Sequence, residues 1–330
     1  MTDKADVLIV TVTKVESQAV IKAFEQEANH QVTQKSICDR VYFDLGTVNG
    51  GRVFLTQSEM GSSGLNGSSQ TVAKGIDALS PLAVIMVGIA FGISEDKQAI
   101  GDILVTEHLR TYELQRVGTQ DNQPQINLRG DKPPASPRLL NLFKSFDVRQ
   151  WDGAEVRFGV VLTGEKLVDN IDFRDQLHSF EPEAIGGEME GAGLYVACQD
   201  KKVDWILVRS ICDWADGNKE QDRKNRQQTA AQNAAQFVLG ALKFTENDWQ
   251  GKRGKGRQFI QNPELSKVMT DQEVVTPALA MARRTLAILE EQAAGFGKLQ
   301  IPTHLTIELE EKRREVAELE ARLRDGESNR

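Results

Sequence analysis

Cysteine and histidine are scarce in this 330-residue sequence, which has three cysteines and four histidines. Cys38, Cys198 and Cys212 lie far apart and form no Cys-x-x-Cys pair, so they are interpreted as reduced thiols of a cytoplasmic protein. No cluster of His, Cys or carboxylate residues has the spacing of metal ligands. We therefore expect neither a metal nor a cofactor.

Long apolar runs are also missing. The first run, Val7 to Val12, is far too short for a signal-peptide core, and no segment approaches the roughly 18 apolar residues that a membrane span requires. Positive charge is not in excess, since the net charge is -8, whereas nucleic-acid-binding proteins normally present a basic face. We expect a soluble protein that binds neither membranes nor nucleic acid. A small anionic substrate needs only a few local cations and is not excluded.

The remaining composition, 40% hydrophobic and 27% charged, is that of an ordinary globular protein. Over the first two thirds, short apolar runs alternate with amphipathic stretches, which is typical of strands that helices cover on both faces. The predicted strands are 7–12, 52–56, 83–87, 102–106, 159–162 and 205–210, and the predicted helices 17–24, 69–79, 191–199 and 227–242. This pattern predicts an α/β sandwich. The polar, proline-rich stretch 113–138 is interpreted as a surface excursion within the domain.

The chain is expected to divide into three regions. Residues 1–245 would form the catalytic domain, the Gly- and Lys-containing stretch 246–258 a linker, and residues 259–330 a small all-helical region. In the last helix, Leu309, Val316, Leu319 and Leu323 form a heptad-like seam beneath alternating acidic and basic residues. Two interpretations stay open: a helical hairpin that completes a small bundle, docks on the main domain or supports oligomerisation, or a module that recruits a regulatory protein partner.

Two carboxylates stand next to predicted elements. Asp213 follows a buried strand, and open α/β sheets bind ligands at the carboxyl ends of their strands. Glu190 precedes a helix that starts with small residues, where a carboxylate can accept hydrogen bonds from vicinal hydroxyls. Either residue alone is more often a helix cap. Together they suit cleavage of a purine from ribose, in which one group protonates the base and another holds the sugar.

The motifs around these residues resemble the nucleoside phosphorylase and methylthioadenosine nucleosidase superfamily. Glu-Met-Glu-Gly-Ala at 188–192 precedes Arg-Ser-Ile-Cys-Asp-x-Ala-Asp at 209–216, and similar segments occur in family order at 10–16, 60–66, 87–92, 101–105 and 162–168. The resemblance covers roughly residues 5 to 245. It implies a three-layer α/β/α fold of the phosphorylase type with a twisted mixed sheet, a purine nucleoside or nucleotide substrate, and a homo-oligomer.

The resemblance also implies roles for individual residues. Asp213 would be the general acid to the purine, and Glu16 would position the attacking water. The residues that would bind the substrate are Ala90, Leu167, Val168, Glu188, Met189, Glu190 and Cys212. Among these, Glu190 and Met189 would contact the ribose. Leu167 would pack on the base, and Val168 would present its backbone to the purine edge.

Departures from the family pattern are informative. Leu167 stands where phenylalanine is common, which weakens base stacking, and Cys212 replaces a frequent serine. The trimeric and hexameric phosphorylases hold phosphate with an arginine and a serine at positions that are here Met86 and Ile89. Because a phosphate nucleophile needs such donors, the sequence favours hydrolysis by water.

The 5′ end of the substrate is less defined by the sequence. Lys14, Arg110 and Lys219 could meet phosphates, although each is also explained as a solvated surface cation. The segment around Asp213 resembles the phosphorylase-like domains of bacterial and fungal immune proteins, some of which cleave ATP to adenine and ribose triphosphate. We therefore expect an antiphage or immune effector that cleaves ATP in this way and is regulated through the C-terminal helices. The alternatives are a housekeeping methylthioadenosine or adenosylhomocysteine nucleosidase, a phosphate-dependent phosphorylase, and a nucleotide-sensing module without catalysis.

Overall fold

The computed structural model describes residues 4–28, 31–120, 123–218, 220, 222–244 and ten residues between 283 and 320. The chain separates into two compact units, Met1–Arg253 and Gly254–Arg330, and each is described by itself. The predicted linker 246–258 lies outside the described residues. Within the described part of the chain, no helix combines the length and the apolar character that crossing a bilayer requires.

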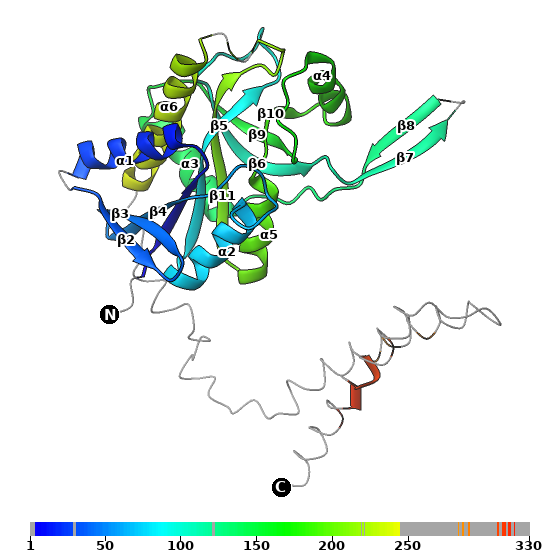
Figure 1. The fold of residues 1–330 in the computed structure, drawn as a ribbon, viewed down its shortest axis with the longest axis horizontal. Helices are drawn as coiled ribbons and strands as arrows, with labels where there is room; N and C mark the ends of the chain where they lie inside the picture. The colour runs from blue at the N-terminus through cyan, green and yellow to red at the C-terminus, as the bar shows by residue number, and fades with distance from the viewer. Residues whose placement is uncertain are drawn as a thin grey trace. The chain divides into compact units, whose positions relative to one another are not determined.

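A nine-stranded mixed sheet forms the centre of the first unit (Figure 1). Its strand order is β10-β9-β6-β11-β5-β1-β4-β3-β2. The bounds are β1 Val7–Thr11, β2 Thr33–Ile37, β3 Arg40–Val48, β4 Gly51–Gln57, β5 Ala83–Gly92, β6 Ile103–Thr111, β9 Val156–Thr163, β10 Ala184–Glu188 and β11 Asp204–Asp213. Strands β4, β1, β5 and β11 run parallel, whereas β6 is antiparallel to β11 and β3 to β4. The predicted mixed sheet is confirmed.

Helices cover both faces of this sheet (Figure 1). Their bounds are α1 Lys14–Ala28, α2 Ser68–Leu79, α3 Pro137–Gln150, α4 Ile171–Phe180, α5 Gly191–Lys201 and α6 Arg223–Phe244. Helices α1 and α3 pack against α6 in one layer, and α2 packs against α5 in the other. Because the central strands are covered on both sides, all of β1 is buried, which explains the apolar run in the sequence. The three-layer α/β/α fold is confirmed.

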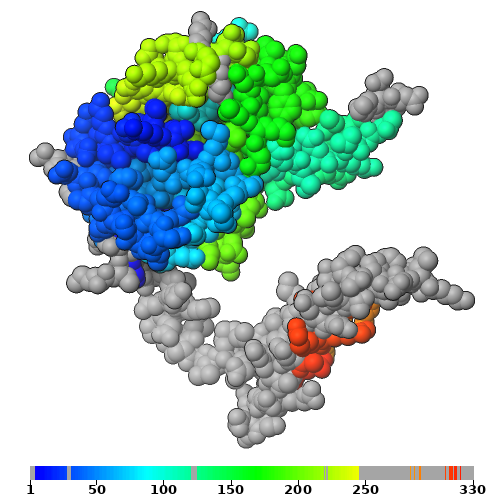
Figure 2. Space-filling model, in the orientation of Figure 1, coloured from blue at the N-terminus to red at the C-terminus, as the bar shows by residue number. Residues whose placement is uncertain are grey.

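The stretch 113–138, predicted as a surface excursion, contains regular structure. Strands β7 (Gln115–Gln120) and β8 (Gln123–Leu128) form an antiparallel hairpin separate from the main sheet, and α3 begins at Pro137. The hairpin extends away from the rest of the unit (Figures 1 and 2). β7 is polar apart from Val117 and Gly118, and the short alternation in β8 contains Pro124, a residue more typical of turns, so the stretch is hard to recognise as two strands from sequence.

In the second unit, the described residues are helical. Arg283 pairs with Glu320 at 2.6 Å, and Arg313 pairs with Glu290 at 2.8 Å. The earlier residue of the first segment, Arg283, pairs with the later residue of the second, Glu320, and Glu290 pairs with the earlier Arg313. This is the pairing order of an antiparallel helical hairpin. Leu309, from the predicted seam, is buried.

Candidate active site

A cavity of about 370 Å³ lies at the carboxyl ends of β1, β5, β10 and β11. This is the edge at which open α/β sheets bind ligands. The structure brings all of the site residues chosen from the sequence to its lining: Glu16, Ala90, Leu167, Val168, Glu188, Met189, Glu190, Cys212 and Asp213. Residues from the first helix and the last strand therefore share one cavity.

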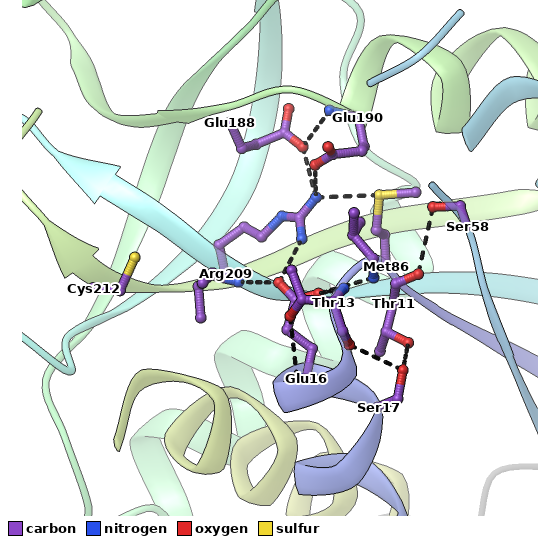
Figure 3. Close-up of polar contacts among 12 residues, drawn as sticks. Thr11, Thr13, Glu16, Ser17, Ser58, Met86, Glu188, Glu190, Arg209 and Cys212 are labelled. Carbon is purple, nitrogen blue, oxygen red and sulfur yellow. Dashed lines mark hydrogen bonds and ion pairs between the residues drawn. The ribbon is translucent and has the colours of Figure 1, made fainter. Parts of the chain in front are cut away.

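Arg209 lies between Glu188 and Glu190 on one side and Glu16 on the other (Figure 3). Its Nη2 lies 2.7 Å from Glu188 Oε2 and 2.9 Å from Glu190 Oε2, and its Nη1 lies 3.6 Å from Glu16 Oε1. The side chain is completely buried in β11. Burial alone would lower the pKa of Arg209, but the negative charges of Glu188, Glu190 and Glu16 outweigh it and raise the pKa. The guanidinium is therefore charged and fixes the carboxylates relative to one another.

Sequence reasoning did not single out Arg209. The available signal is an arginine within the apolar run Trp205–Ser210, since a buried charge requires partners of opposite charge. Gly88 pairs with Arg209 across β5 and β11, and a Cβ atom there would lie 2.1 Å from Arg209 Nη1 and 2.3 Å from Glu16 Oε1. Glycine at position 88 thus leaves room for the ion pair.

Glu16 lies in the first turn of α1, which begins three residues before the predicted start at Ser17. Its Oε2 accepts hydrogen bonds from the backbone N–H groups of Val12 and Thr13 at 2.8 and 2.7 Å. Its Oε1 accepts from the N–H of Ile89 at 2.9 Å. Backbone donors from two strand ends therefore hold this buried carboxylate at the cavity wall, where it can accept a hydrogen bond from a water molecule.

Glu190 follows β10 and is 5% exposed. Its Oε1 accepts a 2.9 Å hydrogen bond from the N–H of Gly61, whose φ of 89° favours glycine. Burial raises the pKa of Glu190 to about 7, with help from the negative charges of Glu188 and Glu16 and opposition from Arg209. Donors from a sugar diol would favour the carboxylate form. Glu190 is therefore suited to hold ribose hydroxyls near neutral pH.

Glu188 holds the turn that carries Glu190. Its Oε2 accepts from the N–H groups of Glu190 and Gly191, each at 2.9 Å. A Cβ atom on Gly191 would lie 2.8 Å from Glu188 Oε1, so the small residue permits this close approach. Glu188 thus positions the start of α5 as well as bordering the cavity.

Asp213 ends β11 and is 4% exposed. Its Oδ1 accepts a 3.0 Å hydrogen bond from the N–H of Ala215, and its Oδ2 accepts one from the Cys212 thiol at 3.1 Å. These donors stabilise the carboxylate that remains after a proton has been released. Asp213 therefore presents a buried carboxyl group, held in a fixed orientation, to the cavity.

The loop that carries Leu167 and Val168 borders the same cavity. Leu167 is 59% exposed, whereas Val168 is buried. Glu165 connects this loop to the turn at residues 60–66. Its carboxylate accepts hydrogen bonds from Ser62 N at 3.2 Å and Ser63 Oγ at 3.1 Å. The exposed Leu167 side chain is available to cover a flat base.

Two of the three cations considered for the substrate's 5′ end, Lys14 and Arg110, do not line the cavity. Arg110 is absent from the cavity lining, because it donates to Gly130 O at 2.7 Å and pairs with Glu181 at 3.6 Å at the base of the hairpin. Lys14 is exposed outside the lining, and Lys219 lies outside the described residues. The lining cations in the described ranges are Lys166 and Arg223. No group of three or more His, Cys, Asp or Glu residues in these ranges is arranged to hold a metal ion.

Two curated relatives are similar in sequence. The chain is 28% identical over 203 residues to the death domain-containing ATP nucleosidase of Amphimedon queenslandica, over 55% of this chain and 37% of that protein. The chain thus spans little more than a third of that relative's length. It is also 28% identical over 180 residues to the 5′-methylthioadenosine/S-adenosylhomocysteine nucleosidase of Staphylococcus epidermidis, over 54% of this chain and 76% of that protein.

Solved structures share the fold. The 5′-methylthioadenosine/S-adenosylhomocysteine nucleosidase of Neisseria meningitidis, in complex with methylthio-immucillin-A, has a TM-score of 0.60 at 22% identity and matches 72% of this chain and 99% of that one. The futalosine hydrolase of Helicobacter pylori has a TM-score of 0.60 at 21% identity, over 74% and 99%. The profile of the Phosphorylase superfamily matches residues 6–243. The chain therefore belongs to the Phosphorylase superfamily, as its motifs predicted.

Proposed function

We propose that this protein hydrolyses the N-glycosidic bond of a purine nucleotide, with ATP as substrate and adenine and ribose triphosphate as products. The observation that carries the proposal is the meeting of Asp213, Glu190 and Glu16 at one cavity. These groups come from three separate parts of the chain. Each has hydrogen-bond partners that suit it to a different task in the reaction.

Departure of the base is the first task. Asp213 donates a proton to N7 of the purine as the bond between C1′ and N9 breaks, and the bonding electrons leave with the base. The Ala215 N–H and the Cys212 thiol then stabilise the Asp213 carboxylate. Val168 and Leu167 border the space for the base. Protonating a leaving group in this way contributes about 10²–10⁴ to the rate.

Attack by water is the second task. Glu190 accepts hydrogen bonds from the ribose hydroxyls while positive charge develops at C1′. Glu16 accepts a proton from water as the water oxygen bonds to C1′, which balances the proton given to the base. Arg209 does not border the cavity and acts as a positioning residue for both glutamates.

Met86 and Ile89 stand where phosphorylases hold phosphate, and their side chains favour hydrolysis over phosphorolysis. The thioether of Met86 accepts from Arg209 Nη2 at 3.4 Å, and the N–H of Ile89 is bonded to Glu16. Neither side chain can donate to a phosphate nucleophile, and the nearby guanidinium is already bound to carboxylates. Water needs no such donors.

Product analysis tests the reaction. With the full chain, we expect ATP to yield free adenine and ribose triphosphate at a rate that does not depend on added phosphate. The assay is chromatography of the products with and without phosphate, with adenosine and methylthioadenosine as parallel substrates. A phosphate requirement would contradict hydrolysis. Adenine from methylthioadenosine alone would instead support the housekeeping nucleosidase, whose fold this chain shares.

The proposal extends to biological role and regulation. An enzyme that destroys ATP must be kept at a low basal rate until it is needed, and residues 259–330 would receive the activating signal from a protein partner. The assays with the purified chain would measure this basal rate. Support comes from the name of the Amphimedon relative, in which an ATP nucleosidase accompanies a death domain. We expect bacteria that express the full chain to keep their ATP until phage infection and then to lose it. An unchanged ATP content during infection would contradict the role.

A further inference from the structure

The proposed reaction leaves one charged part of the cavity lining unused. Arg223 and Gln227 lie on the first two turns of α6, and Thr13 directly precedes α1; all three line the cavity. Glu220, just before α6, also borders it. None of these four residues has a task in proton transfer or in holding the ribose hydroxyls.

The starts of α1 and α6 lie beside each other. The helices pack together, and an ion pair between Glu27 and Lys243 joins their carboxyl ends. The two helices therefore run parallel, with both amino ends at the cavity. Arg223, in the first turn of α6, therefore shares the cavity lining with Glu16, in the first turn of α1, the residue proposed to hold the water that attacks the sugar.

Arg223 is the lining cation that can be released for a ligand. Lys166 is paired with Glu113, whose side chain is 38% exposed, and its Nζ also lies 5.8 Å from the centre of the Tyr112 ring, so two contacts hold it. Arg223 pairs with Glu220 at 2.7 Å, but both side chains are largely exposed, at 51% and 82%. Exposed pairs of this kind contribute little to stability. A phosphate group can therefore replace Glu220 at small cost.

We propose that Arg223 selects 5′-phosphorylated substrates, because its guanidinium exchanges Glu220 for the phosphate chain of a purine nucleotide. This inference rests on the proposed function and deepens it, since it names the residue that distinguishes a nucleotide from a nucleoside. The planar guanidinium presents paired donors that match phosphate oxygens. Glu220 opposes binding, because it competes for Arg223 and repels the phosphate.

Steady-state kinetics of the full chain test this with ATP and adenosine. We expect Arg223→Ala to lower the ratio of kcat/KM for ATP to kcat/KM for adenosine by about 10- to 100-fold, as for a charge-assisted hydrogen-bonded contact. Arg223→Lys should retain part of the ratio. Glu220→Gln should change the ratio in the opposite direction and raise it several-fold. The opposite signs distinguish phosphate recognition from simple loss of the Arg223–Glu220 pair.

Lys224→Ala is the matched control, since Lys224 is the next residue but lines a separate groove between α1 and α6. It should leave the ratio unchanged. An unchanged ratio in Arg223→Ala, or an equal loss in Glu220→Gln, would overturn the inference while leaving the hydrolase reaction intact. If no substrate is cleaved, the proposed function fails separately. Calorimetry then decides the inference, which requires Arg223→Ala to weaken ATP binding to the full chain and Lys224→Ala to leave it unchanged.

Discussion

Asp213→Asn is expected to lower the rate of adenine release by about 1000-fold, within the range for loss of a general acid. The amide has the size of the carboxylic acid but cannot supply the proton that the leaving base requires. Its oxygen can still accept the hydrogen bond from Ala215 N–H, so the fold should be kept. Single-turnover adenine release and thermal unfolding of the same sample would measure the two effects.

Asp216→Asn is the control for this change. Asp216 lies in the loop that follows Asp213, accepts hydrogen bonds from Asn218 and does not line the cavity. Its substitution should leave the rate within about twofold, because only an exposed contact is altered. If Asp213→Asn instead retained both the wild-type rate and the full biological effect, the protein would be a nucleotide-sensing module whose cavity binds without catalysis.

Arg209→Met is expected to have the largest effect on stability. Methionine fills similar space, but it leaves Glu16, Glu188 and Glu190 buried near one another without their shared cation. Removing one partner of a buried ion pair costs about 3–5 kcal/mol. In a domain of this size that corresponds to a fall in Tm of roughly 10 °C. Adenine release should also be lost, because Glu190, which would bind the ribose, and Glu16, which would bind the water, lose their fixed positions.

Arg138→Met provides the comparison. Arg138 pairs with Asp204 at 2.8 Å, but both side chains are about a third exposed, at 29% and 36%. A solvated pair of this kind is worth about 0–1 kcal/mol, so Tm should change little. Equal shifts in Tm for the two variants would show that the buried cluster adds no more to stability than a surface pair.

Apolar periodicity was sufficient to predict the centre of the fold. The predicted strand 83–87 matches the first half of β5. It could be recognised from the sequence because both faces of β5 are covered, so apolar residues occupy its buried positions. The same criterion could not find β2, whose residues Thr33–Ile37 are mostly exposed at the sheet edge. There, backbone pairing with β3 forms the strand without an apolar face.

The carboxylates of the site were recognisable because their motifs stand in a fixed order along the chain. Arg209 was within one of those motifs, but its role depends on side chains from other segments that only the folded sheet brings to it. For a related reason, the sequence does not reveal that Arg110 stays away from the cavity. Arg110 follows a buried part of β6, yet its partners at the hairpin base turn it away from the cavity.

The Arg209 cluster also bears on the order in which the domain is completed. Glu16 is in the first helix, whereas Arg209 is in the last strand of the sheet, so a nascent chain holds the glutamate long before its counter-ion is synthesised. Contacts this distant in sequence form late, since a long loop must close first. Until then the carboxylates stay in water. If the proposed reaction is correct, catalysis therefore requires the sheet to be complete through β11, and an amino-terminal fragment that lacks β11 should be inactive.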